Sequence, residues 1–300
     1  MPRLKKIIPF VRRLAIAYTF ICLFLWFGQE RLLFWPSRVI KKTPSFYNLN
    51  YQNVRLPVST KDGKIEIIHG WWIPASNPQA PIILYFHHNA INIGANVSQA
   101  EDFHKLGYSV LLIDYRGFGQ SEGNFPTESQ VYQDAEAAWN YLINTRKISP
   151  KQIIIYGHSL GAAIAIDIAV KHPEAAGLIV QNSFTNLRDM TKRFGLFWIL
   201  PIDLLLRQRF DSLKKISFLK IPVLFIHGVR DPQIPAKMSQ TLFAATPAPK
   251  RLLLIAEGGH DNNMDKPDLQ KVGKFVEDVM NGKTKNEEVI YEKGFLPLSK

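Results

Sequence analysis

A Gly-x-Ser-x-Gly pentapeptide at residues 157–161 constrains the fold of this chain more than any other feature. The apolar run 152–156 precedes it and the small-residue run 162–170 follows it, which predicts a strand, a sharp turn and a helix. Glycines on both sides of the serine let the backbone turn tightly enough to raise the hydroxyl above the carboxyl edge of a sheet. Ser159 is therefore the candidate nucleophile. The pentapeptide alone is weak evidence, because these three letters occur by chance in roughly one chain of this length in ten.

Apolar strand patterns alternate with helical patterns from residue 82 onward. The predicted strands are 82–86, 109–113, 153–156, 178–180, 223–226 and 251–255, and the predicted helices are 97–106, 128–144, 162–171, 236–245 and 269–280. Continuous apolar strands separated by helices indicate an α/β fold, with a mostly parallel sheet that helices cover on both faces. Residues 54–58 and 65–72, joined by an Asp-Gly turn, predict an antiparallel hairpin at the edge of this sheet.

Roughly forty residues separate the strands predicted at 178–180 and 223–226, far more than a usual connection in such a fold. They include the apolar stretch 194–202, with basic residues beside it. We expect a small helical cap over the site, at about 184–218, apolar enough to accept an acyl chain or to touch lipid. The alternative is a helix that packs on the domain for stability alone.

The net charge of +12 is concentrated at the amino terminus. Residues 1–42 carry nine basic side chains and one acidic side chain, whereas the remainder carries 28 basic and 24 acidic groups. Most of the excess positive charge therefore belongs to the amino-terminal segment and not to a basic groove on the folded domain. We therefore expect no nucleic-acid partner.

The amino-terminal segment has a basic head followed by the apolar run 14–27, which is typical of a secretory or anchor signal. Residues 26–29 offer no Ala-x-Ala-like cleavage site, so we expect an uncleaved membrane anchor helix. As a helix the run measures about 21 Å, short of a hydrocarbon core of about 30 Å, so spanning requires local thinning or snorkelling by Arg13 and Arg31. The alternatives are attachment in the interface, where residues 32–35 would also lie, and a buried helix of the domain.

Two further residues, both later in the chain than Ser159, complete a serine-hydrolase pattern. The strand at 223–226 runs into a loop with Asp231, and the strand at 251–255 runs into a loop with His260. Nucleophile, acid and histidine thus follow in the order, and at the carboxyl strand ends, that a nucleophile elbow requires.

The expected roles follow from the serine hydroxyl, which is a poor nucleophile at neutral pH and needs a base to take its proton. His260 is the candidate base, and Asp231 would orient the imidazole and stabilise the imidazolium. The tetrahedral oxyanion needs two preorganised donors. We expect them from the amide of Leu160 and from the loop after the strand at 82–86, through the Asn89 amide with His88 beside it.

No cofactor and no metal are expected. Adjacent His87 and His88 direct their side chains apart, and no second pair has ligand spacing. Cys22 is the only cysteine, which excludes an intrachain disulfide and a Cys-rich metal site. We expect Asp114 and Arg116 to brace their loop.

Together these segments resemble the α/β-hydrolase superfamily over roughly residues 50–280, and specifically its membrane-anchored bud-emergence-like branch. The resemblance is carried by Tyr85-Phe86-His87-His88-Asn89-Ala90, Asp114-Tyr115-Arg116-Gly117-Phe118-Gly119, Gly157-His158-Ser159-Leu160-Gly161, His227-Gly228 with Asp231, and Gly258-Gly259-His260. It implies an α/β-hydrolase fold and acyl transfer to water. It does not specify a substrate, because similar proteins include esterases, lipases, thioesterases and peptidases.

The family pattern continues Gly-Asn-Ala-Gly after the first histidine, whereas this chain has His88 and Ile91 in the glycine positions. We expect bulk there to narrow the site, to tilt the oxyanion amide or to form a specialised leaving-group pocket. The expected function is a membrane-attached serine hydrolase that cleaves a carboxylic ester or thioester with an apolar acyl group. The alternatives are a catalytically weak binding module of the same fold and a serine peptidase.

The expected organisation is an anchor with basic flanks at 1–42, a hydrolase domain at 43–282 and a tail at 283–300. The basic head predicts a cytoplasmic amino terminus, with the catalytic domain on the other face of the membrane. The expected partners are a small-molecule or lipid acyl substrate and membrane lipid. The physiological substrate, the acyl-chain length, the oligomeric state and the role of the tail stay open.

Overall fold

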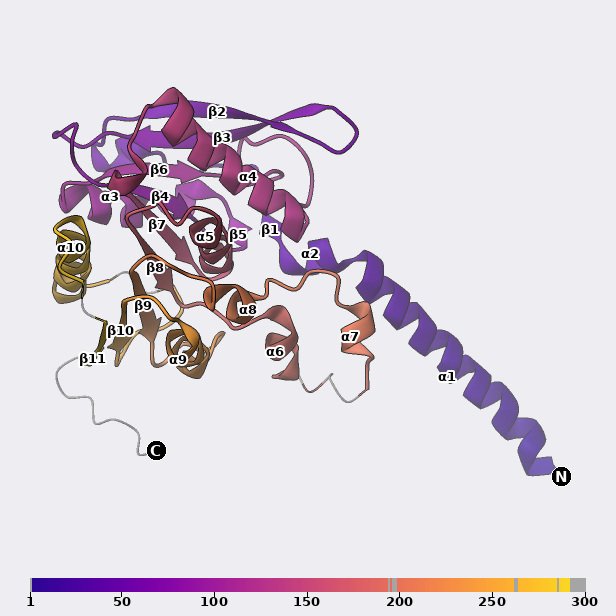
Figure 1. The fold of residues 1–300 in the computed structure, drawn as a ribbon. Coiled ribbons are helices and arrows are strands. Elements are labelled where there is room, and N and C mark those ends of the chain that lie inside the picture. Colours follow the sequence, from indigo (N-terminus) through magenta and orange to yellow (C-terminus); the bar gives the residue numbers. More distant parts are fainter. Residues whose placement is uncertain (1, 194, 196–198, 262–263, 285, 292–300) are drawn as a thin grey trace.

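The computed structural model describes residues 2–193, 195, 199–261, 264–284 and 286–291. Nine strands form one sheet in the order β11-β10-β9-β8-β7-β4-β6-β3-β2 (Figure 1). They are β2 (Gln52–Ser59), β3 (Ile65–Ile73), β4 (Ile82–Phe86), β6 (Ser109–Ile113), β7 (Ile153–His158), β8 (Gly177–Gln181), β9 (Val223–Gly228), β10 (Lys250–Ile255) and β11 (Glu287–Tyr291). A separate short parallel pair joins β1 (Trp35–Pro36) to β5 (Ala90–Ile91).

Helices cover both faces of this sheet, as the alternating patterns predict. The helices are α1 (Pro2–Phe27), α2 (Gln29–Leu33), α3 (Val97–Lys105), α4 (Glu128–Asn140), α5 (Leu160–Lys171), α6 (Leu187–Lys192), α7 (Ile202–Leu205), α8 (Ser212–Ile216), α9 (Ala236–Ala245) and α10 (Lys266–Met280). Along β4, Leu84 and Phe86 join the core cluster beneath α4, α5 and α9, whereas Ile83 and Tyr85 join the cluster beneath α3 and α10. This period of two is why a strand buried on both faces reads as a continuous apolar run.

The antiparallel part of the sheet is confined to one edge. β3 pairs antiparallel with both β2 and β6, and the remaining neighbours in the sheet pair parallel. Gly63 in the β2–β3 turn has a φ of 79°, the left-handed conformation that an Asp-Gly turn supplies. The predicted hairpin and the predicted α/β class with a mostly parallel sheet are confirmed.

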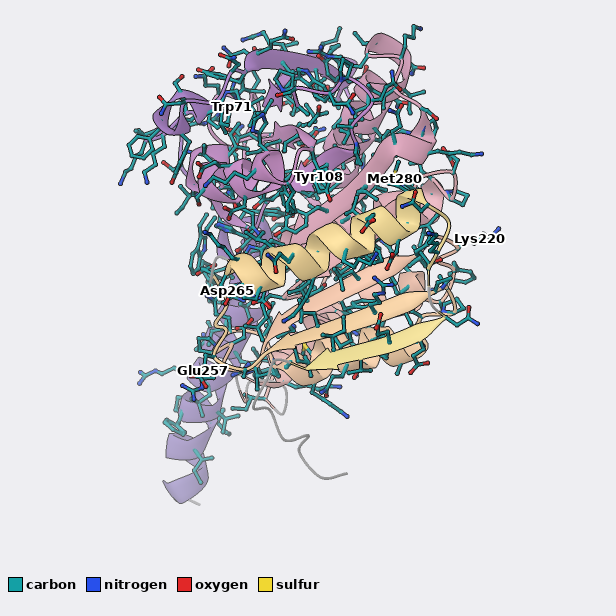
Figure 2. The ribbon with its side chains drawn as sticks, turned by 90° about the vertical axis from the view of Figure 1, so that its left-hand side faces the viewer. Trp71, Tyr108, Lys220, Glu257, Asp265 and Met280 are labelled. Atoms are coloured by element: carbon teal, nitrogen blue, oxygen red, sulfur yellow. The ribbon has the colours of Figure 1, made fainter. Side chains whose placement is uncertain are left out.

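α10 shows how local sequence fixes a helix against the sheet. The carboxylate of Asp265 accepts a hydrogen bond of 2.9 Å from the Asp268 amide and so caps the amino terminus of the helix. The helix then lies across the sheet with Val272, Phe275 and Val276 buried (Figure 2).

The amino-terminal domain boundary predicted at residue 42 needs correction. Phe34 is 0% exposed and packs edge-on against Phe118 and Phe210, with ring centroids 6.2 and 6.4 Å apart. Arg38 donates to the carbonyl oxygens of Ser121 and Gly123. Phe34 and Arg38 therefore belong to the folded domain, and Phe34 does not lie in a membrane interface, because a fully buried phenylalanine is part of the core.

The carboxyl-terminal segment also contributes to the sheet. β11 lies within the tail predicted at 283–300 and pairs parallel with β10 over Lys250–Leu254. The sheet thus extends past the predicted boundary at residue 282. Phe295, Leu296 and Leu298 lie outside the described residues.

α1 is a single helix that projects from the domain (Figure 1). The segment Ile7–Phe27, 21 residues, is long and apolar enough to cross a membrane, and none of its most apolar stretch is buried. The alternative of a buried helix of the domain is therefore wrong. The helix is longer than the apolar run 14–27 because Pro9 does not interrupt it and Arg12 and Arg13 lie within it.

The connection between β8 and β9 forms the expected cap region. It contains α6, α7 and α8, which are short helices separated by loops. Part of the apolar stretch predicted at 194–202 lies outside the described residues.

Candidate active site

Ser159 occupies a strained turn between β7 and α5. Its backbone has φ 56° and ψ −119°, a conformation that costs a non-glycine residue of the order of 1–3 kcal/mol. A Cβ atom on Gly157 would overlap the carbonyl oxygen of Gly161, and one on Gly161 would overlap that of Phe86. The two glycines are therefore required by close backbone approach, and the turn has the geometry predicted for a nucleophile elbow.

The three residues predicted to form the triad meet at the carboxyl edge of the sheet. The Ser159 hydroxyl lies 3.0 Å from His260 Nε2, and His260 Nδ1 lies 2.7 Å from Asp231 Oδ2. All three are almost fully buried. With a proton on Nδ1, the ring donates to the carboxylate and keeps Nε2 free to accept from the serine hydroxyl.

Asp231 is held by several donors. Its Oδ1 accepts from the amides of Gln233 at 2.7 Å and Ile234 at 2.8 Å, while the His227 ring lies 3.5 Å from Oδ2. Burial raises the pKa of Asp231, but hydrogen bonding from His227, His260 and the Ile234 amide outweighs it and holds the pKa well below its ordinary value. The carboxylate is thus ionised and oriented when it faces the imidazole.

The loop that carries His260 is tied to two strand ends. The carbonyl oxygen of His260 accepts from Asn182 Nδ2 at 2.6 Å and from His158 Nε2 at 2.9 Å. Asn182 also accepts from the Gly228 amide at 3.0 Å, so one side chain joins the end of β8 to the loops after β9 and β10. Asn182 has a φ of 48°, a conformation that asparagine adopts more readily than most residues. Sequence reasoning missed Asn182, although an Asn directly after a central strand was the available signal.

The predicted oxyanion residues take different positions. Leu160 opens α5 directly after Ser159, where a helix amide has no intrahelical acceptor, and both Leu160 and Asn89 line the same cavity as Ser159. The Asn89 side chain donates to the Leu33 carbonyl oxygen at 2.6 Å, which fixes this loop to α2. His88 turns back on its own loop, because its Nδ1 accepts from the Ala90 amide at 3.2 Å.

The two departures from the family pattern lie away from the cavity. Neither His88 nor Ile91 is among the described residues that line it, so the expected narrowing is not found there. Ile91 has a φ of 63°, the left-handed conformation for which glycine is suited. The β-branched Ile91 therefore adopts this conformation under strain.

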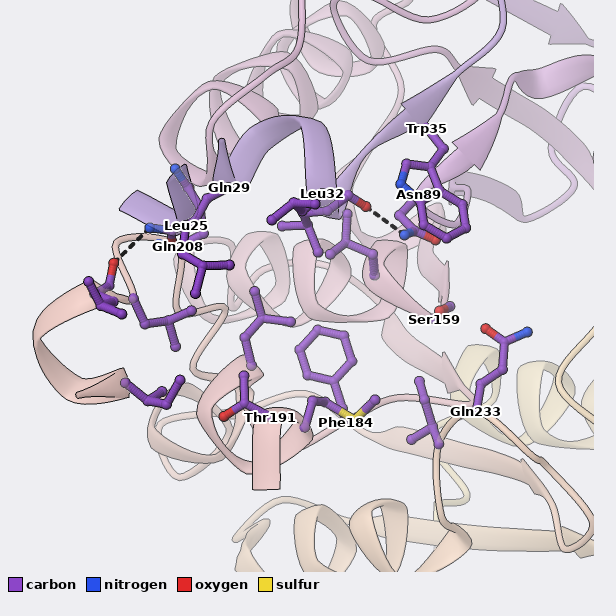
Figure 3. A pocket seen from close by; sticks show the side chains of 18 residues that line it. Leu25, Gln29, Leu32, Trp35, Asn89, Ser159, Phe184, Thr191, Gln208 and Gln233 are labelled. Carbon is purple, nitrogen blue, oxygen red and sulfur yellow. Dashed lines mark hydrogen bonds between the residues drawn. The ribbon is translucent and has the colours of Figure 1, made fainter. Parts of the chain in front are cut away.

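An apolar cavity of about 450 Å³ opens beside Ser159 (Figure 3). It lies between the hydrolase domain, α2, the end of α1 and the cap. The lining residues are mostly aliphatic: Leu25, Gln29, Leu32, Leu33, Trp35, Asn89, Ser159, Leu160, Phe184, Leu187, Met190, Thr191, Ile202, Leu205, Leu206, Gln208, Gln233 and Ile234. The cap therefore forms part of the site, and the alternative of a purely stabilising helix does not describe it.

Several polar residues near the site are structural. Arg116 donates to both oxygens of the buried Asp134 and to Glu66, and Asp114 accepts from the Ile93 amide at 2.9 Å. The His87 ring stacks on Tyr115 with centroids 4.5 Å apart. These contacts brace the loops behind the oxyanion region.

One group among the described residues has ligand atoms close enough to hold a metal ion. It consists of His158, His260 and the exposed Asp261, with ligand atoms within 4.8 Å of one another. Nε2 of His158 already bonds to the His260 carbonyl oxygen, and both ring nitrogens of His260 have partners in Ser159 and Asp231. An ion at this position would compete with the hydrogen bonds that join Ser159, His260 and Asp231.

Comparisons with known proteins agree with this architecture. A family model described as serine aminopeptidase, S33, matches residues 77–206. An uncharacterised protein of Mycobacterium tuberculosis is 34% identical and aligns over 86% of this chain and 89% of its own length. Protein bem46 of Schizosaccharomyces pombe is 30% identical, over 79% of this chain and 81% of its own. A solved esterase structure from Pyrococcus furiosus superposes with a TM-score of 0.67 at 22% identity, covering 83% of this chain and 98% of that one.

The fold and these matches define a hydrolase of the α/β-hydrolase superfamily. The chain belongs to the bud-emergence-like branch of that superfamily, together with bem46. At 22% identity, the likeness to the esterase structure concerns the fold, and the chemistry has to be argued from the site itself.

Proposed function

We propose that this protein is a membrane-attached serine hydrolase that cleaves a carboxylic ester or thioester with an apolar acyl group. The observation that carries the proposal is the Ser159 hydroxyl, which is hydrogen-bonded to His260 and borders an apolar cavity. A nucleophile activated by an adjacent base needs a substrate carbonyl within reach, and the aliphatic lining selects the acyl part of that substrate.

The reaction proceeds in two halves. Ser159 Oγ attacks the carbonyl carbon while His260 Nε2 takes the hydroxyl proton, and the amides of Leu160 and Asn89 bind the oxyanion. His260 then gives the proton to the leaving alcohol or thiol, and the acyl group stays on Ser159. Water, deprotonated by His260, releases the acyl group as a carboxylic acid and restores the enzyme.

The cavity lining favours an ester or thioester over a peptide with a free amino terminus. An aminopeptidase needs an acidic group that pairs with the substrate ammonium. None of the described residues that line the cavity is aspartate or glutamate. The lining therefore supports acyl-group recognition by burial of apolar surface.

α1 is the membrane attachment in this proposal. Exposure of the apolar surface of Ile7–Phe27 to water is unfavourable, so this surface needs a partner. The length of the segment fits a bilayer. The basic residues at its start favour a cytoplasmic amino terminus, with the hydrolase domain on the opposite side. After lysis and a carbonate wash, the intact chain is expected in the membrane fraction. Recovery in the soluble fraction contradicts the attachment.

A fluorophosphonate probe tests the chemistry. The wild-type protein is expected to be labelled, and Ser159→Ala is expected not to be. Ser183→Ala is the control, because Ser183 is also buried after a strand but is not part of the triad. A folded wild-type protein that is not labelled rules out the proposed nucleophile.

A further inference from the structure

The end of the cavity remote from Ser159 is built from the membrane helix and its neighbours. Leu25 lies on α1 and Leu205 lies on α7. Leu33 on α2 lies nearer the active site, because its carbonyl oxygen accepts from the Asn89 side chain. Figure 3 shows Ser159 and Leu25 at opposite ends of the cavity. An acyl chain bound to Ser159 would therefore have to extend through the cavity to reach α1.

A polar clamp on α2, directly after the end of α1, binds the cap. Gln29 Nε2 donates to the Leu205 carbonyl oxygen at 2.7 Å, and its Oε1 accepts from the amides of Arg207 and Gln208 at 2.8 and 3.2 Å. The Glu30 carboxylate accepts from the side chains of Arg207 and Gln208, both at 2.9 Å. Because both side chains bind the segment that follows α7, the wall of the cavity made by α1 and α2 is held against the wall made by the cap.

The cap also follows α1 away from the domain. The Tyr18 hydroxyl donates to the Ile199 carbonyl oxygen at 2.9 Å, and Tyr18 lies about 14 Å before Phe27, the last residue of α1, at 1.5 Å per residue. Ile199 and Leu204 are 67% and 75% exposed, and Phe24 on the adjacent helix is also exposed. Apolar side chains on the cap thus extend the apolar surface of α1, as a surface in contact with a bilayer does.

We infer that the junction of α1, α2 and α7 is an acyl-chain site that lies at the membrane, and that the substrate is a long-chain acyl ester or thioester resident in the bilayer. This inference rests on the proposed hydrolase function. The carbonyl group reaches Ser159 while the chain extends toward Leu25, so each added methylene buries more apolar surface. The membrane helix then contributes to substrate selection as well as to attachment.

The test uses the full-length protein in phosphatidylcholine vesicles and two p-nitrophenyl esters, the acetate in solution and the dodecanoate in the vesicle. The measured quantity is the ratio of kcat/KM for the dodecanoate to kcat/KM for the acetate. Leu25→Trp fills the remote end of the cavity and is expected to lower this ratio about tenfold or more. Leu23→Trp is the matched control on the same helix, because Leu23 is exposed and does not line the cavity.

A second matched pair approaches the site from the cap. Leu205→Trp is expected to lower the ratio, whereas Leu204→Trp, at an exposed position next to it, is expected to leave it unchanged. Fluorophosphonate labelling reveals whether Leu25→Trp is folded. If it is not, the Leu205 and Leu204 variants decide the outcome. Unchanged ratios in both cavity variants, in an enzyme that is labelled and cleaves esters, overturn the inference and leave the hydrolase function standing. A wild-type protein that is not labelled and cleaves neither ester overturns both.

Discussion

The Asn182 side chain donates a hydrogen bond of 2.6 Å to the carbonyl oxygen of His260 and accepts one from the Gly228 amide. One side chain thereby sets the spacing between the loops that follow β8, β9 and β10. The loop after β9 carries Asp231, and the loop after β10 carries His260. The position of the imidazole relative to Ser159 thus depends on a residue that takes no part in proton transfer.

Replacing Asn182 by aspartate tests this positioning role. Aspartate keeps the acceptor for Gly228 and tolerates the left-handed backbone, but it loses the donor to His260. We expect kcat for a soluble ester to fall up to about 100-fold with little change in KM, because a small displacement of a reacting group is costly in rate. If Asn182→Asp lowers thermal stability while kcat is unchanged, the contact is structural only.

The triad geometry predicts strongly coupled losses. Asp231→Asn should lower kcat by about 10⁴-fold, because an amide favours the wrong imidazole tautomer. His260→Ala should cost at least as much. The double variant should be no slower than His260→Ala alone, since the two residues act as one unit on Ser159. Steady-state kinetics on a p-nitrophenyl ester measures all three, and losses that multiply contradict the arrangement.

Ile91→Gly is expected to stabilise the protein. A left-handed conformation costs a non-glycine residue about 1–2 kcal/mol, which exceeds the entropy that glycine loses on folding, about 0.5–1 kcal/mol. Ile91 is 46% exposed, so the loss of about half a side chain of burial offsets part of this gain, and the melting temperature should rise by about 2 °C at most. Ile65→Gly is the control, because Ile65 is exposed but lies in the extended strand β3, and its melting temperature should fall. A lower melting temperature for Ile91→Gly contradicts the strain argument.

His158 makes the folded state sensitive to acid. Burial first, and the neighbouring histidines second, lower the pKa of His158 to about 3, against about 6.5 in an unfolded chain. The unfolded state therefore binds the proton first, and stability is lost as the pH falls below about 6.5. One such group contributes a loss of about 2 kcal/mol between about pH 7 and pH 5. Thermal unfolding of His158→Gln across this range should show a shallower decline than the wild type, and parallel curves contradict this assignment.

The burial of Phe34 predicts that the folded domain includes this residue. Phe34→Ala removes a fully buried ring that contacts Phe118 and Phe210, at an expected cost of about 3–5 kcal/mol in the free energy of unfolding. Phe27→Ala, at a position that is 71% exposed, should cost far less in detergent solution. Equal melting temperatures for the two variants place Phe34 outside the core.

The sequence by itself determined the elements whose signals are local. Gly157 and Gly161 marked the elbow because a turn that tight excludes a Cβ atom, and β4 was predicted with its observed bounds because strands buried on both faces read as uninterrupted apolar runs. The order of Ser159, Asp231 and His260 along the chain indicated a common rim, since parallel strands end at the same edge.

Tertiary structure alone decided the features that depend on contacts between distant residues. Phe34 reads like part of an apolar anchor, and only its contacts with Phe118 and Phe210 make it core. Asn182 directly follows a central strand and Leu25 lies in the apolar run 14–27, but neither local pattern specifies the partners of these residues. The first depends on where three loops converge, and the second on how the cap packs against α1. Burial and hydrogen bonding between segments more than fifty residues apart are set by packing, which a linear pattern of residue types does not encode.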